Sequence, residues 1–392
     1  MSISPFPCST KDTMSATPTS RADFLSRARA LVPILTARQA QATAARDVPP
    51  ESIDDLRQAG LLRLLQPRCF GGEQASVGVF MEIVEILAEG CASTAWVYGV
   101  LAELEWVIAC LPERGQLDIW GDNPEALAAG SIVPRAIGVR ENEGWRVSGR
   151  YAFASGCRHA QWIILGVRCQ DGNGSEEPRY LFVPTPEIEI LDDWHALGMR
   201  GTGSFSIQLH DVFVPEHRSV SIADIAAGTV PGRLVHPDYA VISAPRYYLV
   251  PFVLPAVGFG LARRALATAT AALRDSGKAS DALHLRLGEA AALIEAALLI
   301  FATRRARSVA HLESGAPVTE AGILRNRRDV ALAFRMIRQG VDLLVSLSGA
   351  RAVHDGHPLQ SIQRDLTTIG THIIVNEEAA LVPYGRFLLR PD

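Results

Sequence analysis

Several features that would assign a function at once are missing from this sequence of 392 residues. The six cysteines form no CxxC pair, so we expect reduced thiols and neither a metal site nor a disulfide framework. The net charge of −4 argues against nucleic acid as a partner. The first twenty residues are rich in Ser, Thr and Pro and lack the apolar stretch of a secretory signal. A globular protein of the cytoplasm is the class that we expect.

A membrane-spanning segment is also not expected. The longest apolar run, YYLVPFVLPAVGFGLA from Tyr247, contains Pro251 and Pro255, and a basic pair follows it at once. Its length is close to that of a short spanning helix, but the prolines and the basic pair favour a buried helix. We therefore predict that the protein has no membrane partner.

The stretch DDWHALGMRGTGSFSIQLHDVFVPE, residues 192–216, has the glycines of a phosphate-binding loop without the context of one. A dinucleotide fold needs a helix directly after such glycines. Here the residues from Phe205 to Val214 alternate with a period of two and predict a strand instead. The glycines therefore predict a turn at a strand entry, where the backbone approaches a ligand closely. Direct hydride transfer from NAD(P)H is not expected.

The sequence does contain a change of periodicity, from helical to alternating and back to helical. After a disordered tail at 1–20, residues 21–125 predict an α-helical domain. Residues 126–220 predict a β domain of short antiparallel strands, arranged as a small barrel or sandwich. Residues 221–392 predict a loop followed by four long helices in an antiparallel bundle. The expected fold class is mainly α with a β insert.

Five stretches in this order resemble the acyl-CoA dehydrogenase fold, and locally its oxygenase branch, the flavin-dependent two-component monooxygenases. With their intervals they cover about residue 22 to the C-terminus, and they read AGLLRLLQPRCFGG, ASTAWVYGV, GWRVSGRYAFASGCRHAQWIILG, LGMRGTGSFSIQLHDVFVP and PLQSIQRDLTTIGTH. The resemblance implies an oxygenase component that takes reduced flavin, FMNH2 or FADH2, from a separate NAD(P)H:flavin reductase. With O2 and through a C4a-hydroperoxyflavin, it would hydroxylate or N/S-oxygenate a small aromatic, polyketide or amine substrate. The resemblance also implies a homo-oligomer, a tetramer.

Two other functions stay open. In the dehydrogenase branch a catalytic glutamate often stands nine residues after the Arg of an RD pair. Here the ninth residue after Arg364 is Ile373, which cannot remove a proton, and His372 precedes it as in the similar oxygenases. Some dehydrogenases hold their base elsewhere, so an acyl-CoA dehydrogenase-type flavin oxidoreductase is the alternative. A catalytically silent scaffold is the third hypothesis.

The resemblance implies two catalytic residues. His372, which we expect on the last bundle helix, is either a core histidine or a cavity-facing acid/base, because an imidazole can hold or release a proton near neutral pH. Ser155 ends the strand RYAFASG. It is either a polar strand end or, by the resemblance, a hydroxyl or N–H group near the flavin N5.

The resemblance also supplies candidates for binding the cofactor. Trp96 would wall the flavin ring, or it packs in the core at helical spacing. Arg246 would neutralise a flavin phosphate or the N1–O2 edge of the reduced ring. The full set of cofactor-binding candidates is Trp96, Ser131, Ser155, Gly156, Thr202 and Arg246.

The substrate-binding candidates are Tyr98, Leu104 and His372. Many similar oxygenases carry a histidine where Leu104 stands, as the base for a phenol. Leucine cannot deprotonate a phenol, so ortho-hydroxylation of a phenol either does not occur or depends on His372 alone. Leu104 is compatible with a substrate that is already nucleophilic, such as an amine, a thioether or an enolised polyketide. We assign no metal ligands.

Overall fold

The computed structural model describes residues 19–277 and 279–390, and nearly all of the tail predicted at 1–20 lies outside the described residues. The chain begins with five helices, and side chains at the N-termini of two of them fix where those helices start. Ser20 and Asp23 form a capping box at the first of them. Ser76 caps the third. The helices are α1 (Arg21–Ala45), α2 (Pro50–Gln58), α3 (Val77–Ala88), α4 (Ala92–Ala109) and α5 (Glu113–Trp120).

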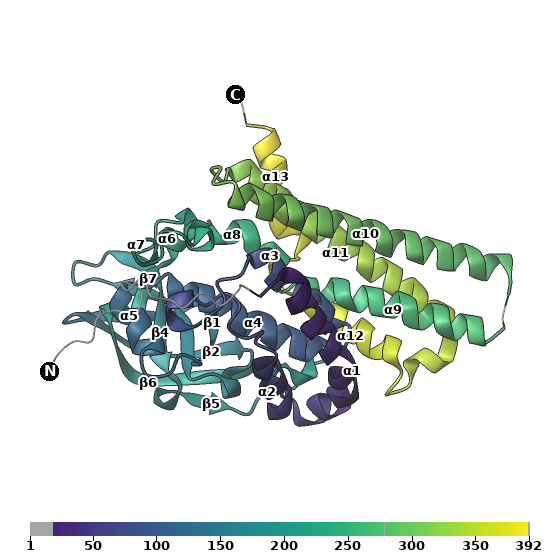
Figure 1. Ribbon diagram of the computed structural model, residues 1–392, viewed down its shortest axis with the longest axis horizontal. Coiled ribbons are helices and arrows are strands. Elements are labelled where there is room, and N and C mark those ends of the chain that lie inside the picture. Colours follow the sequence, from purple (N-terminus) through teal and green to yellow (C-terminus); the bar gives the residue numbers. More distant parts are fainter. Residues whose placement is uncertain (1–18, 278, 391–392) are drawn as a thin grey trace.

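Helix α4 is the central element of the fold. Nearly all of its residues are buried, including the polar Glu103 and Glu105. A helix that is apolar on all sides must be covered on all sides. Figure 1 shows α4 between the sheet on one side and the helices of the C-terminal half on the other. Side chains on its different faces therefore point into different parts of the molecule.

The strands of residues 128–221 form one sheet of seven strands in the order β5-β6-β2-β1-β3-β4-β7. The barrel or sandwich that the sequence predicted is not confirmed, because β5 and β7 stand at the two ends of this order. The prediction of antiparallel pairing throughout is wrong at one place, since β1 and β3 run parallel. The strands are β1 (Ala128–Glu141), β2 (Gly144–Ala154), β3 (Trp162–Gln170), β4 (Glu176–Pro184), β5 (Glu189–Leu191), β6 (Phe205–Pro215) and β7 (Ser219–Ser221).

Short helices link the sheet to the C-terminal half. The loop predicted at 221–240 contains two of them, α6 (Ile222–Ala227) and α7 (Gly232–Val235), and α8 (Arg246–Leu249) follows. The helical stretch Arg246–Asp275 is long and apolar enough to cross a membrane by length and composition, but 78% of its most apolar window is buried inside the fold. The core helix of a soluble protein passes the same test, so this feature is weak support for a membrane span.

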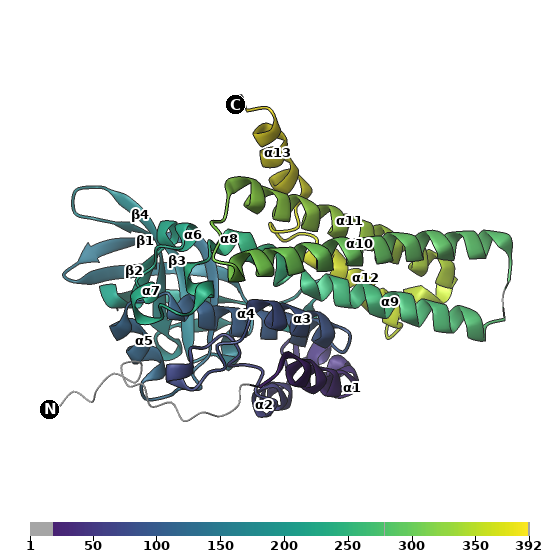
Figure 2. The ribbon, with the colours of Figure 1, turned by 45° about the horizontal axis from the view of Figure 1, so that its top comes forward.

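The C-terminal half contains α9 (Ala256–Asp275), α10 (Asp281–Glu313), α11 (Glu320–Ser348), α12 (Pro358–Ile369) and α13 (Glu377–Leu388). Figures 1 and 2 both show α9, α10 and α11 side by side and extending away from the sheet. The fourth predicted helix is broken in two, and His372 lies in the turn between α12 and α13. The prediction that His372 stands on a helix is therefore wrong. Asn376 explains the restart, because its side chain caps α13.

Four buried cysteines, Cys91, Cys110, Cys157 and Cys169, are free thiols as predicted. Among the described residues no group of His, Cys, Asp and Glu could hold a metal ion.

Candidate functional site

Three residues from distant parts of the chain meet at one place. Trp96 on α4 donates its indole N–H to the Ser155 hydroxyl at the end of β2, over 3.2 Å. The same indole ring stands edge-on to the His372 imidazole, with 5.7 Å between the ring centres. Trp96 and His372 are half-buried, whereas only 6% of Ser155 is exposed. The structure thus brings together both predicted catalytic residues and one predicted cofactor-binding residue.

A chain of hydroxyl groups continues from Ser155 into the loop before β6. Ser155 Oγ lies 2.6 Å from Ser204 Oγ, and Ser204 Oγ lies 2.7 Å from Thr202 Oγ1. Thr202 Oγ1 bonds to the carbonyl oxygen of Met199 over 2.9 Å. Thr202 was predicted as a cofactor-binding residue, but Ser204 was not, although its position two residues further on was a usable signal.

The ring of His372 has a defined hydrogen-bonding state. The backbone N–H of Ile374 donates to His372 Nδ1 over 3.3 Å. In the neutral ring this leaves the hydrogen on Nε2, because a nitrogen that accepts a hydrogen bond carries none. Burial lowers the pKa of His372 to about 4, since the charged ring is poorly solvated there. At neutral pH His372 is therefore an uncharged donor of one N–H group.

Gly156 and Ser131 hold the backbone around the cluster. Gly156 has a φ of +71°, and its N–H donates to the carbonyl oxygen of Thr202 over 3.0 Å. A side chain there would meet Val97 Cγ1 at 2.8 Å, so glycine is required. Ser131 on β1 donates to the carbonyl oxygen of Ala152 over 2.8 Å and is not part of the hydroxyl chain.

Arg246 is buried and already paired. It lies 2.5 Å from the carboxylate of Glu103 on α4 and 3.4 Å from the hydroxyl of Tyr180. Arg246 was predicted to neutralise a flavin phosphate or the N1–O2 edge, but the carboxylate of Glu103 already balances its charge. Among the described residues its Nε has no hydrogen-bond partner and is buried. Arg246 can therefore supply an N–H group rather than a net charge.

The two remaining predicted residues lie on different faces of α4. Each residue of an α-helix turns the chain by about 100°, so Tyr98 faces away from Trp96. Tyr98 is fully buried and its hydroxyl donates to the carbonyl oxygen of Leu61 over 3.3 Å, which is a packing role. Glu103, about two turns after Trp96, faces the same side as Trp96, and Leu104 is rotated from that side by about 80°. Leu104 therefore lies beside the Trp96 face, whereas Tyr98 lies on the opposite side of the helix.

The loop before β6 is fastened to the rest of the fold by its backbone. The N–H of Met199 donates to Asp365 on α12 over 2.5 Å, and the N–H of Gly201 donates to Ser93 on α4 over 3.1 Å. A Cβ atom on Gly198 would lie 2.2 Å from the carbonyl oxygen of Arg364, so this glycine packs flat against α12. The close approach that the glycines predicted is thus to the chain's own helix.

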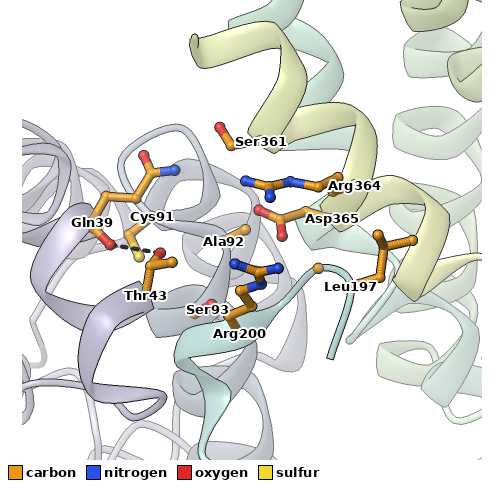
Figure 3. Close-up of a pocket in the computed structure, with 11 residues that line it drawn as sticks. Gln39, Thr43, Cys91, Ala92, Ser93, Leu197, Arg200, Ser361, Arg364 and Asp365 are labelled. Atoms are coloured by element: carbon orange, nitrogen blue, oxygen red, sulfur yellow. Dashed lines mark hydrogen bonds between the residues drawn. The ribbon is translucent and has the colours of Figure 1, made fainter. Parts of the chain in front are cut away.

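A small pocket opens where this loop, α4 and α12 meet (Figure 3). Asp365 lies in it between the guanidinium groups of Arg364 and Arg200. Burial raises the pKa of Asp365 to about 6, and Arg364, Arg264 and Arg200 oppose this rise. Asp365 was not among the predicted site residues, although it holds the backbone N–H of Met199.

The residues of the cluster suit a reduced flavin. An isoalloxazine ring is flat, with hydrogen-bonding atoms along one edge and apolar carbons along the other. Trp96 offers an aromatic face or edge, and Ser155 and His372 offer polar groups. Outside the cluster, Arg246 Nε is a buried donor without a partner among the described residues. This combination of aromatic and orienting polar groups is typical of cofactor sites.

Comparison with known proteins agrees with this chemistry. Residues 252–377 match the family model described as acyl-CoA dehydrogenase, C-terminal domain. An FADH2-dependent resorcinol hydroxylase, oxygenase component, from Rhizobium sp. (strain MTP-10005) is 34% identical over 89% of this chain and 90% of its own length. The oxygenase subunit HsaA of a flavin-dependent monooxygenase from Rhodococcus jostii (strain RHA1) is 32% identical over 92% of this chain and 97% of its own length.

Solved structures show the same relationship. The 3-HSA hydroxylase from Rhodococcus sp. RHA1 has a TM-score of 0.89 and 31% identity, covering 94% of this chain and 98% of its own. XiaF from Streptomyces sp., in complex with FADH2 and glycerol, has a TM-score of 0.86 and 25% identity, covering 95% of this chain and 96% of its own. The chain therefore belongs to the oxygenase components of the flavin-dependent monooxygenases that have the acyl-CoA dehydrogenase fold.

Proposed function

We propose that this oxygenase hydroxylates a small electron-rich aromatic compound at the cluster of Trp96, Ser155 and His372. The observation that carries the proposal is the contact of Trp96 on α4 with Ser155 at the end of β2 and with His372 in the α12–α13 turn. A separate reductase would deliver FADH2 or FMNH2. The bound reduced flavin supplies the chemistry that activates O2 for transfer of one oxygen atom to the substrate.

The protein's own residues have three tasks in this proposal. Trp96 and the apolar side chains near it would cover the flavin ring and exclude water, which limits the loss of activated oxygen as H2O2. The Ser155 hydroxyl orients the flavin N5 position. His372 would hold its Nε2 hydrogen towards the oxygen that is transferred, where it would stabilise developing negative charge.

The substrate class that we propose follows from the lack of a free base among the described residues considered for that role. His372 Nδ1 is occupied by the Ile374 N–H, the Glu103 carboxylate is paired with Arg246, and Leu104 cannot accept a proton. We therefore favour a ring that attacks electrophilic oxygen without prior deprotonation, such as a polyhydroxylated arene, an arylamine or an aryl thioether. The relatives named as resorcinol and p-hydroxyphenylacetate hydroxylases make aromatic compounds the first to try.

We also propose that residues 21–125, 126–220 and 221–392 act as three structural units of a cytoplasmic homotetramer. The proposal is supported by apolar side chains exposed on the bundle, such as Leu285 and Leu299 on α10, which are 71% and 69% exposed. Sedimentation of a monomer at micromolar concentration would contradict it.

The function is tested by supplying reduced flavin from a generic NAD(P)H:flavin reductase, in 18O2, to a panel of phenols, arylamines and aryl thioethers. A product that carries one 18O atom supports the proposal. If no compound of the panel is converted, and the amount of H2O2 formed equals the amount of NAD(P)H oxidised, the proposal is wrong. Anaerobic bleaching of bound oxidised flavin by an acyl thioester would instead support the dehydrogenase alternative.

A further inference from the structure

The hydroxyl chain next to Trp96 runs in one direction only. A carbonyl oxygen cannot donate, so the 2.9 Å contact between Thr202 Oγ1 and the carbonyl of Met199 uses the single hydrogen of the Thr202 hydroxyl. Thr202 Oγ1 then has only lone pairs to offer Ser204, 2.7 Å away, and Ser204 must donate to it. The hydrogen of Ser204 is thereby also used.

The same reasoning fixes Ser155. Ser204 Oγ has only lone pairs left for Ser155, 2.6 Å away, so Ser155 donates its one hydrogen to Ser204. The indole N–H of Trp96, which can only donate, occupies one lone pair of Ser155 from the other side. One lone pair of Ser155 remains, and towards a ligand Ser155 is therefore an acceptor only.

We infer that Thr202 and Ser204 make this site selective for reduced over oxidised flavin by fixing Ser155 as an acceptor. This inference rests on the proposed function, in which Ser155 lies against the flavin N5. The N5 atom of a reduced flavin carries a hydrogen and donates, whereas N5 of an oxidised flavin carries a lone pair and accepts. The remaining lone pair of Ser155 pairs with the former and opposes the latter.

The selectivity suits an enzyme whose flavin arrives reduced and leaves oxidised. An acceptor that faces another acceptor loses a hydrogen bond and gains a repulsion, which together correspond to roughly a ten- to hundredfold difference in affinity. The direction of the chain depends on the Thr202 hydroxyl, because only its contact with a carbonyl removes the choice of donor. Without that hydroxyl, Ser204 can donate to Ser155, and Ser155 can turn its own hydrogen to the oxidised N5.

The test is an anaerobic titration of the protein with FMN and FAD, each in the oxidised and the reduced form. For Thr202→Val we expect the ratio of the two dissociation constants, oxidised over reduced, to fall roughly tenfold. Thr202→Ser keeps the hydroxyl and should keep the wild-type ratio. Thr185→Val is a matched control, because Thr185 also donates to a backbone carbonyl, that of Ala160 over 2.7 Å, outside the chain.

A second variant protects the test against misfolding. Ser204→Ala also frees the hydrogen of Ser155 and should lower the same ratio. If both variants bind the two forms with the wild-type ratio, the inference is wrong. If the wild-type protein binds neither form of either flavin, it is the proposed function that fails, and the two failures are thus distinguished.

Discussion

The role of His372 allows a sharp prediction, because its ring nitrogens are in known states. Nδ1 accepts the Ile374 N–H, and the pKa lowered to about 4 leaves roughly one ring in a thousand protonated at pH 7. The residue can therefore donate from Nε2 but has no free lone pair with which to act as a base. A substitution that preserves the donor should preserve function, and one that removes it should not.

Two variants separate these roles. His372→Ala removes the Nε2 donor. A donor placed at a developing negative charge contributes about 3 kcal/mol, so we expect the rate of product formation to fall roughly a hundredfold while O2 is diverted to H2O2. His372→Gln carries an amide N–H at a similar reach and should retain most of the coupling. A base at this position would make glutamine as poor as alanine, because an amide cannot take up a proton.

The assay measures product, H2O2 and unfolding on one preparation of each variant. Equal losses of product with glutamine and alanine, or a normal yield of product from His372→Ala, would refute the donor role. Stability gives a check without flavin. Since the folded-state pKa lies below the unfolded value of 6.5, the unfolded chain takes up the proton first and the wild type loses stability as the pH falls from 6.5 to about 4. The loss should approach 1.4 kcal/mol per pH unit, on the order of 3 kcal/mol in all, and His372→Gln should not show it.

Three further predictions concern α4 and the assembly. Burial raises the pKa of Glu105 well above its ordinary value of 4.5, and neither of its carboxylate oxygens has a partner among the described residues. In urea titrations the stability of Glu105→Gln relative to the wild type should therefore rise as the pH rises above 4.5, by up to about 1.4 kcal/mol per pH unit. A difference in stability that does not change with pH would contradict this. Glu103→Ala should lower the free energy of unfolding by about 3–5 kcal/mol, because it leaves Arg246 buried and unpaired. The double variant Glu103→Leu with Arg246→Met should recover most of this loss. Equal losses in the single and the double variant would count against the ion pair. Sedimentation velocity at micromolar concentration should show a species heavier than the 42.3 kDa chain.

The sequence predicted the order of the structural blocks because their periodicities are local. The strand predicted from Phe205 to Val214 is confirmed as β6. Its apolar side chains alternate from Phe205 to Leu209, and an irregularity at His210 and Asp211 shifts the alternation before Val212 and Val214. The pairing of the strands, in contrast, could not be predicted from such local patterns. The parallel contact between β1 and β3 depends on which strands come together across the β2 hairpin, and no local pattern encodes this.

The break between α12 and α13 had a local signal that was missed. Asn376 followed by Glu377 and Glu378 is a helix start, with a capping side chain and two acidic residues in the first turn. The apolar residues between His372 and Val375 continued the helical pattern and concealed the turn. The error matters for function, because only a turn gives His372 Nδ1 a free backbone N–H to accept from, two residues further on.

The candidate site depended on the resemblance for its residue types and on the structure for its chemistry. Trp96, Ser155 and His372 could be named from motifs, but a motif does not show that Glu103 neutralises Arg246. Residues 103 and 246 are far apart in sequence, and a buried arginine looks the same in a sequence whether its charge is free or cancelled. Electrostatic roles of this kind need the partner as well as the residue.

The direction of the hydroxyl chain, by contrast, comes from a short local segment. Thr202 reaches the carbonyl of Met199 because the two residues are three apart in a tight turn, in which the Thr202 N–H also bonds to that carbonyl, over 3.2 Å. A threonine or serine at this spacing turns its hydroxyl inward and uses its hydrogen locally. Two short hydrogen bonds transmit this donor direction to the hydroxyl of Ser155, about fifty residues earlier in the chain. A four-residue turn thus sets the donor–acceptor character of a side chain on another strand, and Asp365 and Ser93 keep that turn in place from two different helices.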